Sequence, residues 1–187
     1  MNGIYQEIRV ALHMVWRRRW LALGIAWGVC LLGWLVIGAH AVLAEAGYGY
    51  SSSVAPLVHD HYGWPEAPRF AYRPLADSDF VELPVTTVQL GGRNFAAGGG
   101  GFFRLFPYAL SRWAIRRVNQ QDHRPASFYF HPWEIDPEQP RVAGAPLKSR
   151  MRHYVSLKRM APKLQRLLGD FQWGRTDAVV AEQAALL

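Results

Sequence analysis

The stretch FYFHPWEID, from Phe128 to Asp136, carries the clearest chemical signal in this sequence. Its aromatic residues alternate as they would in a buried strand, His131 ends the run, and Pro132 stops further strand pairing. An imidazole takes or supplies a proton near neutral pH, so general acid catalysis is its natural use. The alternative is a histidine that is simply hydrogen-bonded at a strand end, and spacing alone leaves both interpretations open.

Three other features give weaker signals. His59 to His61 reads HDH, but neighbours two apart in a loop rarely face one ion without a distant third ligand, which favours a solvated loop over a metal site. His123 and His153 stand in polar, basic surroundings and are predicted to lie on the surface. Gly98 to Gly101 is not followed by Gly-Lys-Ser/Thr, so a flexible turn is predicted rather than a phosphate cradle.

Strands and helices are predicted to alternate from residue 41 onward and to position these side chains. The predicted strands are 48–53, 80–90 as one strand or a strand pair with Pro84 at an edge or bulge, 126–131 and 171–173. The predicted helices are a tail over 41–47 closed by Gly47, Pro107 to about Asn119, Leu157 to about Leu168 capped by Ser156, and a last helix opened by Thr176 and Asp177. Residues 54–79 and 91–101 are predicted to be loops, and a proline-rich loop follows His131.

The helix that starts at Pro107 has a predicted apolar and a predicted charged face. Phe106, Ala109, Leu110 and Trp113 are expected to point inward. Its arginines, Arg112, Arg116 and Arg117, are expected to be solvated.

This alternation favours a parallel sheet or barrel, in which chemistry gathers at the C-terminal ends of strands. His131 is placed at such an end. The predicted class is therefore α/β.

Residues 20–39 contain no charged side chain and have about the length of a membrane-crossing helix. Arg17, Arg18 and Arg19 precede them directly, so residues 1–19 are expected to be a cytoplasmic, basic, amphipathic segment and the chain after 40 to be periplasmic. Gly24 and Gly28 are spaced for close helix packing, which allows a homo-oligomer. A cleaved signal peptide ending at Ala39 to Ala41 is the competing interpretation, although the apolar run is long for one.

The composition bounds the partners of the chain. Its 187 residues are 50% apolar, and a formal charge of +7 with a pI near 9.9 favours contact with lipid headgroups, an acidic glycan or nucleic acid. No nucleic-acid-binding module is recognisable, so nucleic acid is not expected as a partner. The single cysteine, Cys30, excludes an internal disulfide framework and a cysteine-built zinc site.

From about Val42 to Val180 the chain resembles the C-terminal part of exosortase-associated, NodB-type polysaccharide deacetylases. The matching stretches are LAEAGYGYSSSVAPLVHDHYGWPEAPRF, ELPVTTVQLGGRNFAAGGGGFFRLFPYALSRWAIRRVN, FYFHPWEIDPEQPR and LKSRMRHYVSLKRMAPKLQRLLGDFQWG. The resemblance implies metal-dependent removal of N-acetyl groups from a polysaccharide of N-acetylated sugars. In that family the histidine of the last motif protonates the leaving amine, and His131 occupies its position.

Residues 1–38 resemble a different family, the exosortase-associated polysaccharide chain-length determinants, through YQEIRVALHMVWRRRWLALGIAWGVCLLGWLVI. Those relatives continue into a coiled periplasmic domain and a second membrane helix, and neither follows here. The two resemblances together predict a bacterial inner-membrane protein that crosses the bilayer once.

The deacetylase family also needs an aspartate pair for the base and one metal ligand, and an H-x-x-x-H pair for the other ligands. This sequence contains neither motif, so no cofactor is expected in this chain, although the complete family binds a zinc-like divalent metal. The expected architecture is a partial, half NodB-type (β/α) barrel after one transmembrane helix, over residues 41–187, with open sheet edges. The expected protein is a deacetylase relative inactive alone; the alternatives are a non-catalytic assembly protein of exopolysaccharide export and a gene-rearrangement product.

Overall fold

The computed structural model describes residues 38–59 and 62–187, which fall into two compact units divided between Gly47 and Tyr48. The predicted segment 1–19 and residues 20–37 of the predicted membrane-crossing segment 20–39, with Gly24, Gly28 and Cys30, lie outside the described residues. No helix in the part of the chain that the structure describes is long and apolar enough to cross a bilayer.

In the first unit, residues 38–45 are helical and a turn follows. Gly47 has a φ of +86°, and its amide donates to the carbonyl of Ala44 at 3.0 Å. This left-handed glycine at the helix end confirms the predicted C-cap.

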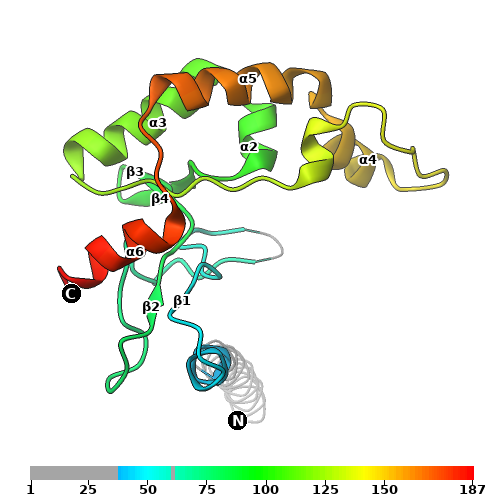
Figure 1. The fold of residues 1–187 in the computed structure, drawn as a ribbon. Helices are drawn as coiled ribbons and strands as arrows, with labels where there is room; N and C mark the ends of the chain where they lie inside the picture. Colours follow the sequence, from blue (N-terminus) through cyan, green and yellow to red (C-terminus); the bar gives the residue numbers. More distant parts are fainter. Residues whose placement is uncertain (1–37, 60–61) are drawn as a thin grey trace, which may run out of the picture. The chain divides into compact units, whose positions relative to one another are not determined.

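The second unit contains two separate pairs of short strands (Figure 1). β1 (Tyr50–Ser51) runs parallel to β2 (Val81–Glu82), and β3 (Thr87–Leu90) runs antiparallel to β4 (Arg93–Ala96). The prediction for 48–53 is confirmed as β1, and that for 80–90 as the two strands on either side of Pro84. The prediction of a loop over 91–101 is wrong at Arg93–Ala96, which form β4. Gly91 and Gly92, with φ of +55° and +77°, make the tight turn of the hairpin between β3 and β4.

The predicted α/β class with a half-barrel is wrong, because the strands are few and short and form two separate pairs. Two-residue strands cannot build a barrel wall, and the segment 126–131 forms only one isolated bridge, between Gly99 and Tyr129. The Ser127 amide bonds instead to the Thr86 hydroxyl oxygen at 2.6 Å. Pairing stops at this bridge because the chain turns into a helix at Gly100 instead of continuing as a strand.

Helices form most of the regular secondary structure of the second unit: α2 (Gly100–Leu105), α3 (Tyr108–Gln121), α4 (Leu147–Tyr154), α5 (Leu157–Asp170), α6 (Thr176–Ala184) and the 3₁₀-helix η1 (Pro132–Ile135). The predicted helices that begin at 107, 157 and 176 are confirmed as α3, α5 and α6. α2, η1 and α4 were not predicted, and 171–173 is not a strand. Ser156 does not cap α5 with its side chain, because its φ of +53° is left-handed and it makes no cap bond.

The main core lies between α2, α3 and α5, and α5 runs beside α3 in Figure 1. Its buried members are Phe103, Tyr108, Ile115, Met160 and Leu167. The predicted inward face of α3 is therefore wrong. The helix turns Tyr108, Ser111, Ile115 and Val118 inward, whereas Leu110 and Trp113 stay exposed.

Lys163 joins α5 to the end of α2. Its ammonium donates to the carbonyl oxygens of Phe103, Arg104 and Phe106 at 3.0, 3.2 and 2.6 Å. The last carbonyls of a helix have no partner within the helix, so a cation there satisfies them.

Asp170 joins the end of α5 to α3. It accepts a hydrogen bond from the Tyr108 hydroxyl at 2.6 Å and lies 2.7 Å from Nε of Arg112. The Tyr108 bond lowers the pKa of Asp170 most; Arg112, Arg116 and Arg166 lower it further, against partial desolvation. Burial and the same bond raise the pKa of Tyr108 to about 12.

We expect Asp170→Asn to destabilise the protein at neutral pH and much less in acid. Because the folded pKa of Asp170 is depressed, its contribution is complete above the unfolded value near 3.8 and is lost as the pH falls through the folded value. Denaturant unfolding of both proteins at about pH 7 and about pH 2.5 measures the difference. Asp77→Asn, at an exposed carboxylate, is the control; a loss for Asp170→Asn that does not shrink in acid would contradict this assignment.

Candidate functional site

His131 is held by its backbone while its ring stays exposed. It precedes η1 in an extended conformation, and its amide donates to Oε2 of Glu134 at 2.8 Å. The Glu134 amide donates in turn to the His131 carbonyl at 2.9 Å. This reciprocal pair resembles a capping box and fixes the point from which the imidazole projects.

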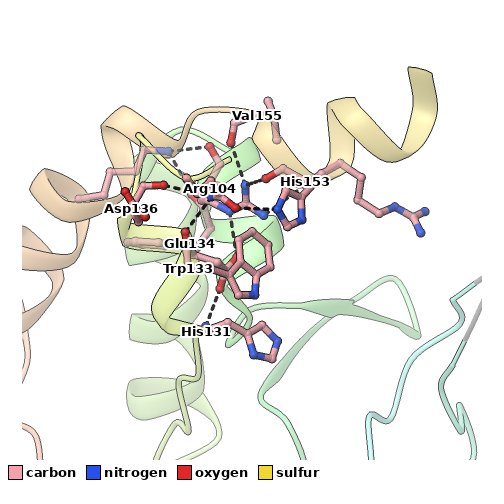
Figure 2. Close-up of polar contacts among 11 residues, drawn as sticks. Arg104, His131, Trp133, Glu134, Asp136, His153 and Val155 are labelled. Carbon is pink, nitrogen blue, oxygen red and sulfur yellow. Dashed lines mark hydrogen bonds and ion pairs between the residues drawn. The ribbon is translucent and has the colours of Figure 1, made fainter. Parts of the chain in front are cut away.

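Glu134 owes its own position to Arg104 of α2. Nε of Arg104 lies 2.9 Å from Oε1 of Glu134, and both side chains are only 2% exposed. A buried ion pair needs further hydrogen bonds to offset its desolvation. Figure 2 shows Arg104 at the centre of such bonds; it also donates to the carbonyls of Arg152, His153 and Val155 at 3.3, 2.8 and 3.0 Å.

The glycine run is a close-packed start to α2 and not a flexible turn. A Cβ on Gly100 would collide with the Glu134 carboxylate, and a Cβ on Gly99 would lie 3.0 Å from the Tyr129 hydroxyl oxygen. A Cβ on Gly101 would meet nothing within 4 Å, because this glycine faces open space. Gly100 therefore lets the backbone approach the ion pair, and Gly99 lets it approach Tyr129.

Three rings stand nearly parallel beside the ion pair. His131 and Trp133 are stacked with ring centroids 5.8 Å apart at 9°, and Trp133 and His153 are stacked at 4.2 Å and 13°. The Arg104 guanidinium lies 5.0 Å from the Trp133 centroid, within cation–π range. His153 is thus half-buried, and its predicted surface position is wrong; Nε2 also lies 2.7 Å from Oε1 of Gln139.

These rings line a cavity of about 710 Å³, which we call the aromatic cavity. Its aromatic lining comprises His59, Tyr62, Phe102, Tyr129, His131, Trp133 and His153. Burial raises the pKa of Tyr129, and so do the nearby Tyr62, to which it is hydrogen-bonded, and Glu134. Tyr129 is therefore a protonated hydroxyl donor at neutral pH. Volume and lining are typical of a small-molecule site.

The described lining does not fit a metal. Among residues 38–59 and 62–187, no three histidine, cysteine, aspartate or glutamate side chains converge. Glu134 is engaged by Arg104 and by the His131 amide. Of the HDH motif, His59 stacks on Tyr62 at 4.0 Å, while residues 60 and 61 lie outside the described part. His123 lies apart from the aromatic cavity, exposed, as predicted.

A family model described as a domain of unknown function, DUF3473, matches residues 52–181. The chain belongs to the DUF3473 family. This family is associated with polysaccharide deacetylase-like proteins, which supports the predicted lineage at that level. No curated protein and no solved structure matches the chain.

The DUF3473 match contains the whole described site, from His59 to Val155. It does not reach residues 1–51, so the comparisons give no support to the predicted relation of residues 1–38 to chain-length determinants or to a fusion. His131 was predicted from the sequence, whereas Arg104 and Glu134 were missed. The available signals were one arginine in the apolar run GFFRLF, and a glutamate three residues after His131.

Proposed function

We propose that this DUF3473 domain binds a polysaccharide of N-acetylated amino sugars and presents His131 as the acid for cleavage of the acetamide. The observation that carries the proposal is the exposed imidazole at the aromatic cavity, on a backbone clamped by the buried pair of Arg104 and Glu134. The aromatic lining of the cavity suits the apolar parts of sugar rings, and the Tyr129 hydroxyl suits a sugar oxygen.

In the proposed reaction, water adds to the acetyl carbon, the carbon–nitrogen bond breaks, and the imidazolium of His131 gives its proton to the leaving amine. A neutral amine leaves far more readily than an amide anion, so the acid acts at bond cleavage. A divalent metal, the group implied for the complete family, would polarise the acetyl carbonyl. The described residues supply no site for it, so its ligands would come from outside the described residues. Glu134 is paired with Arg104 and is not assigned as the base.

The test is binding of a β-1,4-linked N-acetylglucosamine tetramer to the full chain, with acetate release followed in the same samples after addition of zinc or cobalt. We expect binding without acetate release. Trp133→Ala should weaken binding at least about tenfold, because it removes the indole that stacks with both the His131 and the His153 ring in the cavity lining. His131→Gln should change affinity less than about threefold. In the parent protein, bound sugar should shift the His131 imidazole NMR signal, which is assigned by its absence from this variant.

Two variants control this experiment. Trp133→Phe keeps a flat ring and should retain most of the affinity, whereas Trp113→Ala removes an exposed tryptophan outside the aromatic cavity and should leave affinity unchanged. Equal binding by Trp133→Ala and the parent would refute the sugar site. Metal-dependent acetate release that disappears in His131→Ala would show instead that the 187 residues are catalytically complete.

A further inference from the structure

A second cavity, of about 530 Å³, lies on α3 and α5. It shares no lining residue with the aromatic cavity. We call it the arginine cleft, after its principal lining residues: Arg112, Trp113, Arg116, Arg117, Gln120 and Arg166. The α3 arginines were predicted to form a solvated face, and the sequence gives no sign that Arg166 of α5 joins them.

The arginine cleft carries an unbalanced positive charge. In the part of the chain that the structure describes, Asp170 is the one carboxylate that forms an ion pair with these arginines, through Arg112 at 2.7 Å. Four guanidinium groups against one carboxylate leave a net charge of +3 (4 − 1) at this site. The lowered pKa of Asp170, to which Arg112, Arg116 and Arg166 contribute after the Tyr108 bond, reflects the same concentration of charge. Guanidinium groups pair well with carboxylates because two N–H donors match two oxygens.

The cleft also offers a surface for a sugar ring. Trp113 is 40% exposed, although indoles usually gain from burial, and the Arg117 guanidinium lies 5.9 Å from its ring centroid. Gln120, one turn beyond Arg116, adds amide donors and an acceptor at the same cavity. A flat apolar ring beside guanidinium and amide groups recognises a molecule with both apolar ring faces and carboxylates.

We propose that the arginine cleft binds a carboxylate-bearing segment of a glycan. Its volume suits a few sugar rings, which distinguishes it from the extended basic stripe expected for nucleic acid and from the apolar helix face expected for a bilayer surface. This assignment goes beyond the proposed function, because it requires neither His131 nor the aromatic cavity.

The experiment measures calorimetric binding of a galacturonate oligomer to the full chain. The same oligomer with its carboxyl groups methyl-esterified is the neutral control ligand. Arg116→Gln/Arg117→Gln should weaken binding at least about tenfold, and Arg166→Gln on α5 should weaken it independently. Arg93→Gln/Lys158→Gln removes the same charge from exposed positions outside the cleft and should change affinity less than about twofold. Trp113→Ala should also weaken binding, and thermal unfolding should show all variants folded.

Three results would overturn the assignment. One is equal affinity for the esterified and the free oligomer. Another is an equal loss of affinity in Arg93→Gln/Lys158→Gln, which would mean that binding depends on the net charge of the protein and not on the cleft. The third is tighter, cleft-dependent binding of single-stranded DNA or of phosphatidylglycerol vesicles, which would assign the cleft to a different class of partner. Loss of uronate binding with N-acetylglucosamine binding intact would separate the two sites.

Discussion

Replacing Glu134 by glutamine is expected to lower the free energy of unfolding by about 3–5 kcal/mol, the usual cost of leaving one member of a buried ion pair without its partner. The substitution keeps the size of the side chain but leaves the Arg104 guanidinium, 2% exposed, without a counter-charge. The three carbonyl acceptors of Arg104 remain, so we expect a folded but weakened protein. Denaturant unfolding measures the loss.

Glu138→Gln is the matched control, because it removes an exposed carboxylate four residues away, and it should change stability by less than about 0.5 kcal/mol. In a double-mutant cycle, Arg104→Met combined with Glu134→Gln should cost less than the sum of the single changes. Strict additivity would mean that the two side chains do not depend on each other for stability.

Gly100→Ala is expected to have the next largest effect, about 1–3 kcal/mol of destabilisation, because its methyl group would enter the space of the Glu134 carboxylate. Glu134 also accepts a hydrogen bond from the His131 amide at the start of η1, the helix that carries Trp133, so affinity for the N-acetylglucosamine tetramer should fall along with stability. Thermal unfolding and calorimetric binding of the same variant test the two expectations together.

Gly101→Ala provides the comparison within the same helix. Nothing lies near the added methyl group, and alanine is the better helix former, so this variant should be unchanged or more stable by up to about 1 kcal/mol. If both variants behaved alike, the close approach of Gly100 to Glu134 would not matter energetically.

The sequence predicted local structure best where residues that favour the start or the end of a helix stand at the boundaries. Pro107, Gly47 and Thr176 mark element ends that the structure confirms. Prediction failed where tertiary contacts determine which side chains are buried and which segments pair as strands. The face of α3 was misplaced because Ser111, a small polar residue, is buried while Trp113 is exposed. The predicted strand at 126–131 has the right alternation, but its neighbour turns into a helix at Gly100, and alternation in one segment says nothing about whether a partner strand exists.

The sequence allowed one residue of the candidate site to be predicted. His131 stands out because an alternating aromatic run ends on it directly before a proline. Trp133 and His153, by contrast, are 20 positions apart, and only the folded chain stacks them. The same holds for Arg104 and Glu134, whose pairing depends on the packing of α2 against η1 and so leaves only a weak trace in the sequence.

Side chains of other elements place opposite charges at the two ends of the short helix α2. It has only six residues, too few to be stable as an isolated helix in water. The Glu134 carboxylate faces its first residue, Gly100, and the Lys163 ammonium binds its last carbonyls. Both charges complement the helix dipole, which is positive at the N-terminus and negative at the C-terminus. Arg104 belongs to this helix, so α2 connects a lysine of the core helix α5 to the groups that hold His131.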